Sequence, residues 1–315
     1  MKFRLRSRVA AGVAAAGLGL GLGLVSAVPI RNDLPLSEKG SIGTFHGLDI
    51  TRDVLVKGIH SHNDYWRDVP LFSALSYGVV SVEADVWHFQ GDDTLYVGHN
   101  TASLASDRTL ASLYIDPLLD ILAAANPKNQ FTVNQTVPNG VFDTYSEQTL
   151  YLFIDVKTDG MLTWPFVEAA LKPLLDKGWL TTVSGKEITT RPVTVIGTGN
   201  TPYAYLVSQK DRFYFFDGPI EALNETAYPA HVNPIASGSL QSAVGSKIGP
   251  NGLDSAQYNK IKGLVDRAHD MGIATRFWEV PWWPVVTRNA LYRQIIEIGS
   301  DLLNADDLAL AATFV

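Results

Sequence analysis

The chain has 315 residues, of which 46% are hydrophobic, so it is long enough to bury a large core. Its net charge of −7, with basic residues clustered only within the first eight positions, argues against a nucleic-acid partner. The absence of cysteine excludes disulfides, thiolate metal sites and a cysteine nucleophile. We therefore expect a domain whose stability depends on its apolar core.

The N-terminus predicts a targeting segment. Basic residues precede an uncharged apolar stretch from Val9 to Ile30, and small residues before Val28 predict cleavage after Ala27. Residues 1–27 are thus predicted to be a signal peptide of a secreted protein. An uncleaved membrane anchor in the secretory pathway is the alternative, because about 20 apolar residues can span a bilayer. Glycosylation sequons at Asn134 and Asn224 could carry sugars in that compartment.

Residues 28–53 lack periodicity and are predicted to be an N-terminal extension, whereas in residues 54–315 strand-like runs alternate with amphipathic ones. Eight such repeats favour a closed (β/α)8 TIM barrel, with an open doubly wound sheet as the alternative. Long loops at 92–149 and 237–252 are expected at the catalytic rim. The predicted strands are 54–59, 79–86, 150–156, 192–197, 212–216, 230–235, 273–279 and 300–304, and helices are predicted at 70–77, 164–177 and 258–271, each followed by a glycine.

Polar clusters follow three of the predicted strands, where a parallel barrel displays its catalytic groups. The first cluster runs from His60 to Asp64. In the second, Glu83 and Asp85 are two residues apart, so their side chains point to one face of the strand and can share a hard cation. In the third, Asp155 can add another oxygen ligand. A rim ion pair is the alternative for the first two carboxylates, and a salt bridge with Lys157 is the alternative for Asp155.

Three tryptophans, Trp278, Trp282 and Trp283, follow one another closely at a predicted strand end. Amphipathic rings suit a wall against a choline-like cation or a lipid. Barrel packing is the alternative, and Glu279 could pair with Arg276.

The order His, Glu-x-Asp, His, Asp-x-Lys and Trp over residues 60–278 resembles the phospholipase-C-like phosphodiesterase superfamily, which includes glycerophosphodiester phosphodiesterases and sphingomyelinase D. The segments IHSHNDY, VEADVW, LYVGHN and LFIDVKTDG resemble in particular the fungal altered inheritance of mitochondria protein six family. Ser61 stands where the glycerophosphodiesterase signature has an arginine, and the chain has no cysteine for the bridged loop of the spider toxins. These departures leave the substrate less defined than the chemistry.

The resemblance implies a TIM-barrel phosphodiesterase that depends on a divalent metal, usually Mg²⁺, with Ca²⁺ or another divalent ion as alternatives. It implies a phospholipid or glycerophosphodiester substrate, a possible peripheral contact with membranes, and hydrolysis or cyclisation by two histidines. The implied roles are catalysis for His60, His99 and Lys157, metal binding for Glu83, Asp85 and Asp155, and substrate binding for His62, Asn63 and Trp278.

Two other functions remain open at this stage. A catalytically silent barrel would act as a lipid- or protein-binding module. A glycoside hydrolase would use a pair of carboxylates, such as Glu83 and Glu279, and would need neither the histidines nor a metal.

Overall fold

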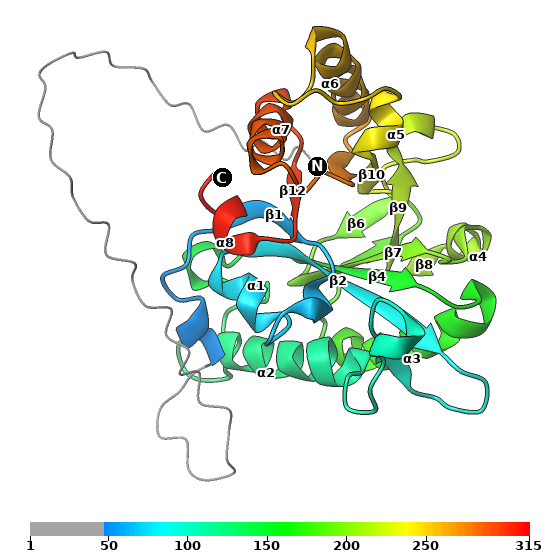
Figure 1. Ribbon diagram of the computed structural model, residues 1–315. Helices are drawn as coiled ribbons and strands as arrows, with labels where there is room; N and C mark the ends of the chain where they lie inside the picture. Colours follow the sequence, from blue (N-terminus) through cyan, green and yellow to red (C-terminus); the bar gives the residue numbers. More distant parts are fainter. Residues whose placement is uncertain (1–46) are drawn as a thin grey trace, which may run out of the picture. The chain divides into compact units, whose positions relative to one another are not determined.

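The structure, a computed structural model, describes residues 47–315 (Figure 1). The predicted signal peptide and most of the predicted extension therefore lie outside the described residues. Between residues 47 and 315, no helix has the length and apolar composition needed to cross a membrane.

Eight parallel strands form a closed barrel. The sheet runs from β1 through β12, β11, β10, β9, β7 and β4 to β2, and β1 pairs with β2 to close it. The predicted (β/α)8 TIM barrel is thus confirmed. The barrel strands are β1 (Lys57–Ser61), β2 (Val79–His88), β4 (Leu150–Val156), β7 (Val193–Gly199), β9 (Phe215–Pro219), β10 (Ile235–Ser239), β11 (Ala274–Trp278) and β12 (Leu302–Ala305).

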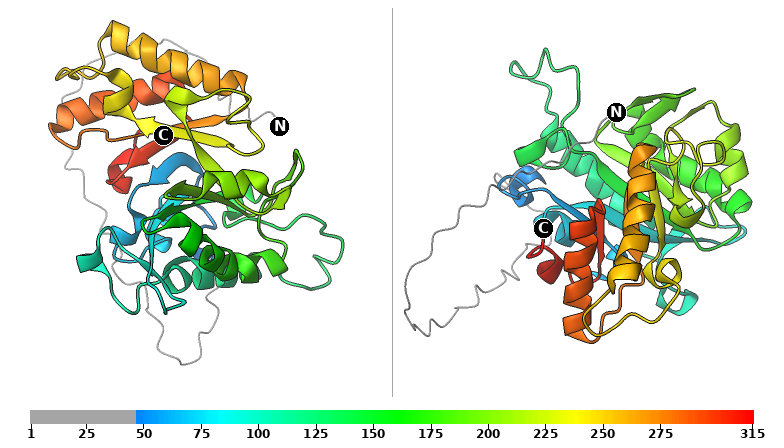
Figure 2. Two further views of the ribbon diagram at one scale, coloured as in Figure 1. Left: turned by 90° about the vertical axis from the view of Figure 1, so that its right-hand side faces the viewer. Right: turned by 90° about the horizontal axis from the view of Figure 1, so that it is seen from above.

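Helices surround the barrel, with α2 and α3 on one side and α6 and α7 on the opposite side (Figures 1 and 2). All three predicted helices are present, and Gly78, Gly178 and Gly272 follow them with positive φ angles, as helix ends often require. The helices are α1 (Phe72–Ser76), α2 (Asp116–Ala125), α3 (Gly160–Asp176), α4 (Tyr203–Ser208), α5 (Leu240–Val244), α6 (Ser255–Asp270), α7 (Val285–Ile298) and α8 (Leu308–Ala311).

Smaller elements decorate the barrel. Strand β3 (Leu95–Val97) pairs antiparallel with the end of β2, and β5 (Thr182–Ser184), β6 (Glu187–Thr189) and β8 (Asp211–Arg212) form a separate antiparallel sheet. Short 3₁₀ turns occur at η1 (Gly47–Ile50), η2 (Asp64–Trp66), η3 (Thr101–Ser103), η5 (Asp143–Tyr145) and η6 (Ile220–Ala222), and a π-helical turn, η4 (Ala111–Ile115), precedes α2.

Four predictions of segment position were wrong. The strand predicted at 230–235 is β10, which begins only at Ile235, because Pro234 has no N–H to donate to a sheet. Its pairing with β9 and β11 carries it into the predicted loop at 237–252, where α5 follows. The strand predicted at 212–216 is divided between β8 and β9. The loop predicted at 92–149 contains β3, η3, η4 and α2, and its remaining part at 126–149 leads from α2 into β4, so that part lies at the amino end of the barrel, away from the predicted catalytic rim.

The alternation along β2 separates the core from the site. Val82, Ala84 and Val86 are fully buried and belong to the apolar core. Ser81 and Glu83 instead contact residues of other barrel strands. The apolar series therefore faces the helices, and the polar series faces the interior of the barrel.

Candidate active site

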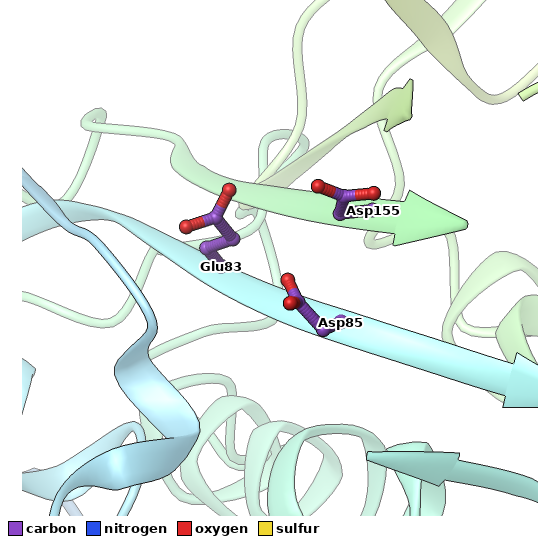
Figure 3. Close-up of side chains that lie close together, drawn as sticks. All are labelled: Glu83, Asp85 and Asp155. Atoms are coloured by element: carbon purple, nitrogen blue, oxygen red, sulfur yellow. The ribbon is translucent and has the colours of Figure 1, made fainter. Parts of the chain in front are cut away.

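Three carboxylates converge at the carboxyl ends of two neighbouring strands. Asp85 of β2 and Asp155 of β4 are direct partners in the parallel register, and Glu83 precedes Asp85 by two residues. Figure 3 shows the three side chains projecting from the same face of these two strands. One oxygen atom from each carboxylate lies within 4.8 Å of the other two. The structure thus brings together the three residues that the sequence suggested as metal ligands.

The charges in this cluster suit a divalent cation. Burial and the negative charges of Glu83 and Asp155 raise the pKa of Asp85 to about 7. Lys157 Nζ lies 2.9 Å from a carboxylate oxygen of both Asp85 and Asp155. Arg276 Nη1 lies 3.9 Å from Glu83 Oε1 but also pairs with Asp217, so these two cations do not balance the four carboxylates around them. Mg²⁺ and Ca²⁺ prefer carboxylate oxygens, and their charge would relieve this repulsion. The residues present therefore fit such an ion.

Gly199 lets the backbone of β7 pass close to the cluster. Its φ is +61°, and a Cβ at this position would lie 2.0 Å from Asp155 Oδ1. Any other residue would push the Asp155 carboxylate aside, so the position requires glycine.

His60 is fully buried beneath the carboxylates, and both of its ring nitrogens have partners. Arg276 Nη1 donates to His60 Nε2 at 2.7 Å, so Nδ1 carries the proton and donates to Ser81 Oγ at 2.7 Å. Burial, aided by the Arg276 charge, lowers the pKa of His60 to about 3. His60 is therefore a neutral histidine without a nitrogen free for substrate.

His62 is more accessible, with 30% of its side chain exposed. Its Nδ1 lies 2.8 Å from Asp306 Oδ1, and its Nε2 lies 3.9 Å from Glu83 Oε2. Asn63 has a left-handed backbone, which asparagine tolerates, and its N–H donates to Glu83 Oε2 at 3.0 Å. The first cluster thus orients Glu83, and His62 Nε2 also lies 3.4 Å from Asn63 Nδ2.

His99 is half exposed at the end of the β2–β3 pair. Its Nδ1 lies 3.9 Å from Asp85 Oδ2 and 3.3 Å from the hydroxyl of Tyr65. The Tyr65 hydroxyl also donates to Asp85 Oδ2 at 2.7 Å, so this buried tyrosine links the histidine to the carboxylate cluster. Tyr65 was not predicted as a site residue, although it belongs to the same motif as His60 and His62.

Arg276 was missed as a site residue. Its buried guanidinium lies inside the barrel, donates to Asp217 Oδ2 at 3.2 Å and lies 3.9 Å from Glu83 Oε1. From the sequence, Arg276 was an alternative partner for Glu279. In the structure Glu279 instead accepts a hydrogen bond from Ser239. Arg276 is two residues from both Ala274 and Trp278 on β11, so the three side chains share one strand face. This alternation was the sequence signal that could have identified Arg276 as a site residue.

Two predicted residues lie apart from these contacts. Trp278 ends β11 with 37% of its surface exposed, and none of the hydrogen bonds or ion pairs of residues 47–315 joins it to the cluster. Asp64 is buried and accepts hydrogen bonds from Ser61 and from the Leu71 backbone, so it anchors the loop after β1.

The comparisons with known proteins agree with this architecture. A family model described as an AIM6-like phosphodiesterase domain matches residues 48–217. The altered inheritance of mitochondria protein 6 homolog of Arthroderma benhamiae is 42% identical over 98% of this chain and 99% of its own length. Altered inheritance of mitochondria protein 6 of Eremothecium gossypii is 38% identical over 84% of this chain and 71% of its own length.

Among solved structures, phosphatidylinositol-specific phospholipase C from Listeria monocytogenes matches with a TM-score of 0.34 and 12% identity, over 78% of this chain and 93% of that one. This likeness is too distant to support an argument about the site. The closed barrel and the family match define a TIM barrel with an AIM6-like phosphodiesterase domain. The chain belongs to the altered inheritance of mitochondria protein 6 family.

The contacts of Arg276 predict a large stability effect. Replacing it with methionine removes the buried partner of Asp217 and Glu83, so we expect the free energy of unfolding to fall by about 3–5 kcal/mol. Urea unfolding measures the change. Arg293→Met, at an exposed position that stacks on Phe314, is the control and should stay within about 0.5 kcal/mol.

If Arg276→Met does not fold, Arg276→Lys serves instead. It keeps the charge but loses the fork of donors, so a smaller destabilisation is expected. Wild-type stability in Arg276→Met would contradict the central role of this side chain.

Proposed function

We propose that the chain is a divalent-metal-dependent phosphodiesterase that acts on the phosphodiester of a phospholipid or glycerophosphodiester. The observation that carries this proposal is the set of three convergent carboxylates joined by Lys157 and flanked by His62 and His99. All of these groups belong to the carboxyl-end face of a parallel barrel, where such folds carry their active sites.

Glu83, Asp85 and Asp155 would hold the metal. A bound divalent cation supplies positive charge that stabilises the charge developing on a phosphoryl group. Lys157, held 2.9 Å from two of the carboxylates, supplies a second positive charge at the same place. The buried Arg276 lies below Glu83 and fixes the floor of the site.

Proton transfer is assigned to His62 and His99. Both rings are partly exposed, and each is oriented through Nδ1, by Asp306 for His62 and by Tyr65 for His99. One would accept the proton of the attacking hydroxyl or water, and the other would donate to the leaving oxygen. His60, which the family resemblance implied as catalytic, would instead hold Arg276 and Ser81 in place.

Exposed apolar side chains favour a lipid substrate. Trp66 follows β1, Phe89 follows β2, and Trp282 and Trp283 follow β11, so these exposed rings share the face that carries the carboxylates. Aromatic rings of this kind favour the boundary between water and lipid. Together with the exposed ring of Trp278, they support a peripheral contact with a membrane.

The proposed metal site predicts that the same substitutions abolish both the stabilisation by magnesium and the activity. Magnesium should raise the melting temperature of the wild-type protein, because it relieves repulsion among three carboxylates. Glu83→Gln and Asp85→Asn should abolish both this shift and phosphodiester hydrolysis. Asp266→Asn, which removes an exposed carboxylate paired with Lys262, is the control and should change neither.

Substrates for this test are a lysophospholipid, sphingomyelin and a glycerophosphodiester, each with and without chelator. Melting curves that do not respond to Mg²⁺ or Ca²⁺ at several millimolar would refute the metal site. No turnover of the panel with metal present would favour the silent barrel, and sugar hydrolysis that resists chelator would favour the glycoside hydrolase.

The histidine assignment predicts different defects. His62→Ala and His99→Ala should each lower turnover by about two orders of magnitude or more with unchanged melting temperature. His60→Ala should also lower turnover, but with a lower melting temperature, because Arg276 and Ser81 lose a buried partner. His269→Ala, at a position away from the cluster, should be nearly silent. If His62→Ala turns over substrate as fast as the wild type, His62 is not catalytic, and His60 would be the second catalytic histidine.

A further inference from the structure

We propose that a cavity beside the candidate active site binds a second anionic group of the substrate, such as a phosphomonoester or a carboxylate. The inference rests on the proposed function and narrows its substrate class. The cavity measures about 370 Å³ and lies between residues 65–68, after β1, and residues 97–108, around the end of β3. Its charged lining residues are Arg67, Arg108 and Asp68.

The cavity shares a wall with the candidate active site. Tyr65 and Trp66 line the cavity. The Tyr65 hydroxyl reaches Asp85 and His99, and the ring of Trp66 lies 5.0 Å from the ring of His99. A substrate bound at the carboxylates can therefore extend past His99 toward the cavity.

Neither arginine forms an ion pair with a carboxylate, although the charge of Arg67 acts on the buried Asp64, to which Ser61 links it. Arg67 donates through Nε and Nη2 to Ser61 Oγ and to backbone carbonyls, and Arg108 donates through Nη2 to the carbonyl of Tyr65. Neither forms an ion pair within residues 47–315, a property that they share with Arg191, Arg212, Arg267 and Arg293. Arg67 and Arg108 differ from those four arginines in that both line one cavity, in a chain with a net charge of −7.

The arginine N–H groups without a hydrogen-bond partner indicate the chemistry of the ligand. Arg67 Nη1 and Arg108 Nε and Nη1 have no hydrogen-bond partner in the described part of the chain. Guanidinium groups bind phosphate and carboxylate oxygens through paired N–H donors. Two arginines and the single carboxylate of Asp68 give the lining a net charge of +1, which favours an anion over the zwitterionic or neutral end of a lipid.

The test begins with binding of inorganic phosphate to the full chain, measured by calorimetry without divalent metal. Arg108→Gln should weaken this binding about tenfold or more, the scale of losing charged hydrogen bonds. Arg191→Gln, which removes the same charge from a half-buried position outside the cavity, is the matched control and should bind as the wild type does. If Arg108→Gln does not fold, Arg108→Lys replaces it, with an intermediate affinity expected.

A kinetic arm separates free phosphate from a substrate-borne group. Glycerophosphoglycerol and its terminal phosphate ester differ only in the second anionic group. We expect a lower KM for the phosphate ester in the wild type and in Arg191→Gln, and loss of this difference in Arg108→Gln.

Two outcomes would overturn the inference. If Arg108→Gln binds phosphate as tightly as the wild type, the proposed anion site is refuted. If the wild type has equal KM values for the two diesters, the cavity does not bind the second anionic group of the substrate. If neither diester is turned over, the proposed function fails. Calorimetry with the two diesters as ligands then still decides the inference, since only the anion site predicts tighter binding of the phosphate ester.

Discussion

The polar interior of this barrel depends on one buried arginine. Arg276 lies on β11 and contacts one residue from each of six other barrel strands, and a buried charge of this kind is tolerated only when its donors are satisfied. Its guanidinium also stacks over the ring of Phe153. The arginine therefore joins strands that are far apart in sequence and fixes the floor on which the acidic cluster is built. Its contacts are His60, Glu83, Phe153, Asp217, Ser237 and Asn304.

This arrangement divides the histidines by their environment. The guanidinium of Arg276, which contacts Glu83, also donates a hydrogen bond to Nε2 of His60. His62 and His99, by contrast, lie above the carboxylates with half or less of each side chain exposed. The site therefore has three layers from the floor to the mouth: a buried cation, three carboxylates, and partly exposed imidazoles beside exposed aromatic rings.

Much of the fold could be predicted from the sequence, because apolar runs followed by polar residues mark strands that end at a barrel rim. Glu83 and Asp85 could be assigned to one strand face from their spacing alone, and the structure places them so. The position of β10 could not, because Ala236 and Gly238 are poor strand formers by composition and belong to the sheet only through pairing with β9 and β11. The same is true of Tyr65, whose hydroxyl meets His99 only after β3 folds back on β2.

The sequence by itself determined the barrel class, the family and the residue types of the acidic cluster, since local periodicity and short motifs are properties of neighbouring residues. Only the tertiary structure decided which polar residues meet. Arg276 and His60 are separated by 216 positions, and Asp306 and His62 by 244. Contacts over such separations depend on closure of the sheet between β12, β1 and β2. No local pattern encodes that closure, so the division between a buried histidine and an accessible one became visible only in the folded barrel.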